Sequence, residues 1–124
     1  MSHPRIRLGV VMDPIERIKP VKDTTLAMLL EAQRRGYALE YLTQADLWVM
    51  EGRLGMRLRS LTVQDDPRRW FELGPVREAD PDALDVLLMR KDPPFDMEYI
   101  YTTFLLERAE HAGVLVVNKP AALR

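Results

Sequence analysis

The feature that most constrains the fold of this chain is a recurring order of apolar strand, helix and second strand. In its first occurrence, an apolar strand at residues 5–12 is followed by a helix at 24–35 and a strand at 37–42. Asp23 is a suitable N-cap for that helix. Gly36 stands where a left-handed residue usually ends a helix. A strand that returns directly after such a helix pairs in parallel with the first one, so the sequence predicts a βαβ unit.

The second occurrence follows the same order near the end of the chain. An almost continuously apolar strand is predicted at residues 84–89, as in a strand covered on both faces. Asp96 is a suitable N-cap for the next helix. Gly113 marks its end, and a final buried strand is expected at 114–117.

The middle of the chain has a different pattern. Residues 46–50 and 56–63 are predicted to be strands of an antiparallel hairpin, because residues 51–55 between them contain two glycines. Residues 68–73 are predicted to form a short helical turn, and residues 75–81 a polar loop. The whole pattern predicts an α/β, Rossmann-like domain: a mainly parallel sheet flanked by helices, with an antiparallel hairpin insertion.

Length and composition limit the class of protein. The chain has 124 residues, which suits a single domain over residues 1–124. Its formal net charge of −1 gives no electrostatic reason to expect nucleic acid or a membrane as a partner. It has no cysteine and only two histidines, so disulfides, thiolate metal sites and histidine triads are not expected. No transmembrane or signal segment is recognisable, and a cytoplasmic protein is expected. The last residues resemble the start of another helix, which suggests a piece of a longer protein.

Charged residues follow three of the predicted strands at their carboxyl ends, which is the edge where open α/β sheets bind ligands. The predicted site residues are Asp13 after the first strand, and Arg90, Lys91, Asp92, Asp96 and Tyr99 after or beyond the strand at 84–89. Asn118 and Lys119 follow the last strand and are expected at a domain junction.

Several of these residues also have a purely structural interpretation. Arg90 and Lys91 suit a carboxylate or phosphate, but Arg90 could equally pair with Asp92 or Asp96 and hold the turn. Asp13, which precedes a proline, is a common turn former. Asp96 is expected to be a helix cap first.

The helix after Asp96 has an apolar stripe that is expected to face the core. Its members are Met97, Ile100, Tyr101, Phe104, Leu105, Ala109 and Ala112. Tyr99 lies off this stripe and is expected at the edge of the site. The sequence contains no Gly-x-Gly-x-x-Gly after the first strand and no Gly-Lys-Ser/Thr loop, so no glycine-loop nucleotide site is expected in this chain.

Four stretches resemble the N-terminal domain of bacterial glutathione synthetases. They are residues 8–14 (LGVVMDP), 28–37 (MLLEAQRRGY), 88–96 (LMRKDPPFD) and 117–120 (VNKP). The Arg-Lys-Asp-Pro-Pro-Phe-Asp run is the most specific of them, and the resemblance covers nearly the whole chain in order. It implies a Rossmann-like domain of an ATP-grasp ligase that joins γ-glutamylcysteine to glycine through an acyl phosphate. ATP and Mg²⁺ serve that family as cofactors, and full-length members form homo-oligomers.

The resemblance also implies roles for single residues. Arg90 would hold a substrate carboxylate, Asp13 would meet the γ-glutamyl ammonium or a backbone donor, and Lys91 and Asp92 would order the loop. No catalytic or metal-binding residue is expected in this chain, because the ATP-grasp domains would follow residue 124. The isolated chain is therefore expected to bind no cofactor and to be inactive. Two alternatives stay open: another ATP-grasp acid–amine ligase, and a stand-alone Rossmann-like binding or assembly module.

Overall fold

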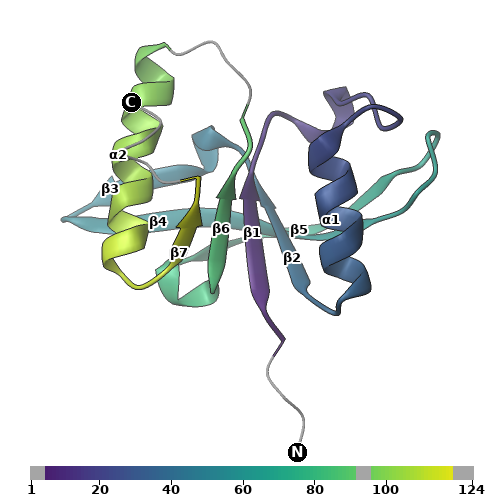
Figure 1. Cartoon of the computed structure of the whole chain (residues 1–124). Coiled ribbons are helices and arrows are strands. Elements are labelled where there is room, and N and C mark those ends of the chain that lie inside the picture. Colours follow the sequence, from purple (N-terminus) through teal and green to yellow (C-terminus); the bar gives the residue numbers. More distant parts are fainter. Residues whose placement is uncertain (1–4, 92–95, 119–124) are drawn as a thin grey trace, which may run out of the picture.

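A computed structural model describes residues 5–91 and 96–118 of the chain (Figure 1). The strands are β1 Arg7–Val11, β2 Ala38–Leu42, β3 Leu47–Met50, β4 Arg53–Val63, β5 Phe71–Ala79, β6 Val86–Met89 and β7 Leu115–Val117. The helices are α1 Thr24–Arg34 and α2 Met97–His111, with short 3-10 turns at Ile15–Arg17, Gln44–Asp46 and Pro81–Ala83.

One sheet contains all of these strands, and its central part is parallel. β1 pairs in parallel with β2 on one side and with β6 on the other, and β6 pairs in parallel with β7. β4 is antiparallel to β2 and to β3, which confirms the predicted hairpin insertion. The expected α/β, Rossmann-like fold with two βαβ units is therefore confirmed.

The expectation for residues 68–81 was wrong. A helical turn and a polar loop were expected there, but Phe71–Ala79 forms β5, which pairs with β4 along most of its length. Gly74 and Pro75 look like strand breakers in the sequence. In the structure they lie at an irregularity of the ladder between Arg59 and Leu61 of β4, on a strand that pairs with β4 alone among the described strands. Bulges and edge strands are the places where a sheet tolerates proline.

The predicted helix ends are confirmed. The carboxylate of Asp23 accepts a 2.8 Å hydrogen bond from the backbone N–H of Leu26, and Asp96 caps α2 in the same way. Gly36 has a φ of 89° and Gly113 a φ of 102°, the left-handed conformation that a helix C-terminus uses. Neither described helix is long and apolar enough to cross a bilayer.

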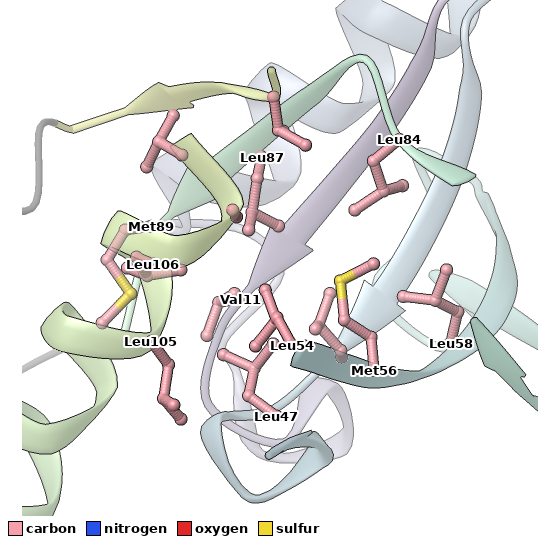
Figure 2. Packing of buried hydrophobic residues seen from close by; sticks show 14 of the residues in the cluster. Val11, Leu47, Leu54, Met56, Leu58, Leu84, Leu87, Met89, Leu105 and Leu106 are labelled. Atoms are coloured by element: carbon pink, nitrogen blue, oxygen red, sulfur yellow. The ribbon is translucent and has the colours of Figure 1, made fainter. Parts of the chain in front are cut away.

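Buried side chains form a core on each face of the sheet. The core on the α1 face contains Leu8 and Val10 of β1 with Leu26 and Leu29 of α1. The core on the α2 face is drawn in Figure 2, where Val11, Leu87 and Met89 from the strands meet Leu105 and Leu106 of α2. The hairpin contributes Leu47, Leu54, Met56 and Leu58 to this second core.

The orientation of α2 differs from the predicted stripe. Leu105 and Ala109 are buried as expected, but Met97, Tyr101 and Phe104 are exposed. Tyr99, Leu106 and two threonines face the core instead. The hydroxyls of Thr102 and Thr103 donate to the carbonyls of Glu98 and Ile100 within the helix, so both threonines are buried with their hydrogen bonds made.

β7 also departs from the expectation of a wholly buried strand. Val116 points into the core beside α2, but Leu115 is 55% exposed and Val117 is 40% exposed. Side chains alternate between the two faces of a strand, so Leu115 and Val117 lie on the opposite face, the one that carries α1.

Candidate functional site

The candidate site lies where β1, β6 and β7 end. Since these strands are parallel neighbours, with Val11 paired to Met89 and Leu88 paired to Val117, their carboxyl ends reach the same edge of the sheet. The backbone N–H of Arg90 donates to the carbonyl of Val11 at 2.8 Å and continues the ladder beyond β6. The predicted meeting of these strand ends is confirmed.

The start of α1 holds the guanidinium of Arg90. Its Nε donates to Thr25 Oγ1 at 3.2 Å, and its Nη2 donates to Thr24 Oγ1 at 2.9 Å. Both contacts reach across from β6 to the first turn of α1. They use Nε and Nη2, so among the described residues Nη1 is left without a hydrogen-bond partner. Arg90 is therefore oriented by hydroxyls rather than neutralised by a carboxylate within the described residues.

Lys91 and Asp13 form an ion pair across the ends of β6 and β1. Lys91 Nζ lies 3.3 Å from Asp13 Oδ1, and the two side chains are 15% and 35% exposed. The lysine is thus largely enclosed and fixes the turn that begins with Asp13. The ordering role expected of Lys91 stays a prediction.

A hollow of about 160 Å³ opens between Asp13, the first turn of α1 and Arg90. A neighbouring hollow of about 290 Å³ shares Asp13, Ile18, Lys22 and Asp23 with it. The lining adds three cations that the prediction did not include, namely Arg17, Lys19 and Lys22. Together with Arg90, they outnumber the carboxylates of Asp13 and Asp23, and the Asp23 carboxylate already caps α1. The lining therefore favours an anionic ligand.

The three cations could have been found from the sequence by their place, whereas the two threonines could not. The cations stand in the loop between the Met-Asp-Pro turn and the start of α1, next to the same strand end. The threonines look like ordinary helix-start residues, so only the long-range contact with Arg90 identifies them.

The remaining predicted residues lie in different surroundings. Asn118 Nδ2 donates to the carbonyl of Met89 at 3.2 Å and joins the ends of β7 and β6. Asp96 Oδ1 accepts from the backbone N–H of Tyr99 at 2.8 Å, as expected of a cap. Tyr99 is 3% exposed and belongs to the core on the α2 face, so the structure places it in the core rather than at an edge of the site. Asp92 and Lys119 lie outside the described residues.

Ile15 attaches the loop beside the site to neighbouring elements. Ile15 is fully buried, its N–H donates to the hydroxyl of Tyr41 at 3.3 Å, and its carbonyl accepts from Trp70 Nε1 at 3.2 Å. Burial raises the pKa of the Tyr41 hydroxyl. β2 and the segment before β5 thereby fix the loop that carries the three cations.

The described residues do not fit a divalent metal ion. Over residues 5–91 and 96–118, no three His, Cys, Asp or Glu side chains gather in a way that would hold one. Hard cations such as Mg²⁺ require oxygen ligands in a defined geometry. The cations at this edge suit an anionic ligand.

Comparison with known proteins agrees with this arrangement. Residues 6–124 match the family described as "Prokaryotic glutathione synthetase, N-terminal domain". The chain is 60% identical over 119 residues to the glutathione synthetase of Pseudomonas syringae pv. tomato, covering 96% of this chain and 37% of that protein. It is 56% identical to the glutathione synthetase of Salmonella typhimurium and 54% identical to that of Shewanella oneidensis, covering 96% of this chain and 38% of each relative. The chain thus spans less than two fifths of the length of these relatives.

Proposed function

The chain belongs to the family of prokaryotic glutathione synthetase N-terminal domains, and we propose that it is the substrate-side domain of an ATP-dependent ligase. The proposed reaction joins γ-glutamylcysteine to glycine through an acyl phosphate and releases ADP and phosphate. The observation that carries this proposal is the match over residues 6–124, at 60% identity to one such enzyme.

In this proposal the domain forms one wall of the dipeptide site. Arg90 binds a substrate carboxylate, for which the planar guanidinium is well suited. Asp13 meets the γ-glutamyl ammonium or a backbone donor, while Lys91 and Asp92 order the loop. Asp96 and Tyr99 act indirectly, through the start of α2. Asn118 and Lys119 lie near the junction with the rest of the enzyme.

The charge of the hollow supports the choice of ligand. γ-Glutamylcysteine carries two carboxylates and one ammonium group, and the lining offers an excess of cations together with the carboxylate of Asp13. The hydroxyls of Thr24 and Thr25 keep Arg90 in place before the ligand arrives. A guanidinium that is already oriented loses less side-chain entropy on binding.

The remaining properties are proposed from the family. ATP and Mg²⁺ are assigned to the ATP-grasp domains beyond this chain, as the family implies. The full-length enzyme is proposed to be a cytoplasmic homo-oligomer that acts on small molecules, without nucleic-acid or membrane partners.

The test is the substitution Arg90→Ala in the full-length enzyme, with kinetics measured separately for each substrate. Loss of a charge-assisted hydrogen bond worth about 1.5–3 kcal/mol raises the Michaelis constant for γ-glutamylcysteine by roughly ten- to a hundredfold. The Michaelis constants for ATP and glycine are expected to change much less.

Arg69→Ala is the matched control, because Arg69 is an exposed arginine that does not line either hollow. Its kinetics should equal those of the unchanged enzyme. If Arg90→Ala leaves both the dipeptide Michaelis constant and the turnover unchanged, the role of Arg90 is refuted. A full-length enzyme that makes no glutathione from these substrates refutes the function itself.

A further inference from the structure

One face of the sheet is only partly covered within the described residues. α1 and α2 pack on opposite faces, and α1 lies over the β1 and β2 end (Figure 1). No described helix covers the α1 side of β6 and β7. Parallel strands are normally buried on both faces, and β6 and β7 are apolar at every position.

Apolar side chains gather on this uncovered area. Val86 and Leu88 of β6 lie beside Leu115 and Val117 of β7, because the register pairs Val86 with Leu115 and Leu88 with Val117. Met28 of α1 and Leu8 of β1 complete the surface, whose floor is formed by Leu8 and Leu88, both buried beneath it. These six residues are called the open face below. Leu115, Val117 and Met28 are 55%, 40% and 41% exposed.

The open face is also hollowed. A groove of about 530 Å³ runs between α1 and β6, and its lining includes Leu8, Met28, Val86 and Leu88. A contiguous apolar groove with large side chains exposed along it is typical of a surface that another element covers. An amphipathic helix would fill it in the way that helices cover both faces of an α/β sheet.

We propose that the open face is the docking surface for the part of the polypeptide that follows this domain. The inference rests on the proposed function, under which the domain continues into a longer enzyme. The relatives have well over half of their length outside the matched region. Under that function, the rest of the enzyme follows β7, whose Leu115 and Val117 are members of the open face. A segment tethered there has an effective concentration on the order of millimolar, as is typical of a short linker. This is well above the concentration at which a second copy of the chain would be present.

The absence of cysteine from residues 1–124 allows a direct test. Leu115→Cys and Met28→Cys are introduced one at a time into the full-length protein, with any cysteine outside residues 1–124 replaced by serine. Val76→Cys is the matched control, because Val76 is a strand residue that is 57% exposed and lies in β5, away from the open face. The rate of thiol labelling is measured for each variant and normalised to its rate in urea.

Covered positions react only when the docked part opens, so Leu115→Cys and Met28→Cys should label at least about tenfold more slowly than Val76→Cys. Labelling of Leu115→Cys within about twofold of Val76→Cys would overturn the proposal. Protection that disappears on dilution would also overturn it, because a second copy would then be the occupant.

Ligase activity of the same preparations separates the two proposals. Full-length protein that makes no glutathione but protects Leu115→Cys would refute the function and leave the docking surface intact. Active protein in which Leu115→Cys labels as fast as Val76→Cys would refute the docking surface and leave the function intact.

Discussion

At the scale of single residues, two hydroxyls determine how Arg90 is presented. Thr24 and Thr25 each accept one hydrogen bond from its guanidinium, and both stand in the first turn of α1. The first turn of α1 thereby holds, by hydrogen bonds, a side chain that lies 65 residues further along the chain. In the proposed function, these two contacts orient the guanidinium that binds the substrate carboxylate.

The double substitution Thr24→Val, Thr25→Val tests this orientation in the full-length enzyme. Valine keeps the shape and removes both acceptors, so Arg90 samples more rotamers and binds the dipeptide less well. A weakening of about 1 kcal/mol raises the Michaelis constant for γ-glutamylcysteine roughly fivefold, with turnover changed less. Combined with Arg90→Ala, the threonine changes should add nothing further. A full additional effect in that background would contradict the orienting role.

Tyr41 provides a second prediction at this scale. Its hydroxyl accepts from the buried N–H of Ile15, so Tyr41→Phe leaves a buried donor unpaired. The free energy of unfolding should fall by about 1–3 kcal/mol in urea titrations. Tyr37→Phe is the control, since Tyr37 is half-buried and stands outside that contact. Equal losses for the two variants would show that the bond to Ile15 contributes nothing.

Tyr41 also makes stability depend on pH on the alkaline side. Burial raises its pKa in the folded protein, so its contribution is complete below the ordinary tyrosine pKa of about 10. The contribution is lost as the pH rises through the folded value, because the unfolded chain then ionises first. Tyr41→Phe should therefore flatten the decline in stability above about pH 10. An unchanged alkaline slope would contradict this assignment.

At the scale of elements, the β3–β4 hairpin depends on one glycine under an indole ring. Trp48 pairs with Gly55, and a Cβ placed on Gly55 would overlap the indole of Trp48. The ring also lies 5.5 Å from the guanidinium carbon of Arg57, so moving it disturbs a second contact. The hairpin supplies Leu54 and Met56 to the core on the α2 face, and its local geometry therefore affects the whole domain.

Gly55→Ala is expected to lower the free energy of unfolding by about 1–3 kcal/mol, the usual effect of overpacking. Gly74→Ala in β5 is the matched control, because a Cβ there would meet Ser60 Cβ at an ordinary 3.4 Å. Thermal and urea unfolding of both variants give the comparison. Equal effects of the two substitutions would mean that Trp48 moves aside without cost.

At the scale of the whole molecule, the described residues contain a candidate recognition edge but no set of three metal ligands. Cations and Asp13 line the hollow at the strand ends, and nothing in the described residues replaces the ligands that a magnesium nucleotide requires. Recognition and phosphoryl transfer would then belong to different parts of the enzyme.

The purified 124-residue chain is accordingly expected to show no glycine-dependent release of ADP above the blank. The assay contains ATP, Mg²⁺, γ-glutamylcysteine and glycine, and the full-length enzyme serves as the positive control. Measurable turnover by the chain alone would show that it holds a nucleotide site. It would refute the proposed separation of substrate recognition from phosphoryl transfer.

The local signals of the sequence determined most of the fold. Asp23 and Asp96 mark helix starts and Gly36 and Gly113 mark helix ends, since caps act through neighbouring backbone groups. The apolar strands between them fixed the parallel pairing and the shared edge of the candidate site. The resemblance carried by residues 88–96 identified the family before any contact was known.

The tertiary structure decided what depends on partners distant in sequence. β5 forms across Gly74 and Pro75 because β4 offers a pairing edge with a ladder irregularity, which a local pattern cannot reveal. α2 turns Tyr99, Thr102 and Thr103 inward because the sheet sets its orientation and the threonines bond within the helix. Arg90 meets Thr24 and Thr25, and Lys91 meets Asp13, only after the strands align. Apolar periodicity shows which face of a helix is rich in apolar residues. Packing against elements distant in sequence decides which face is buried.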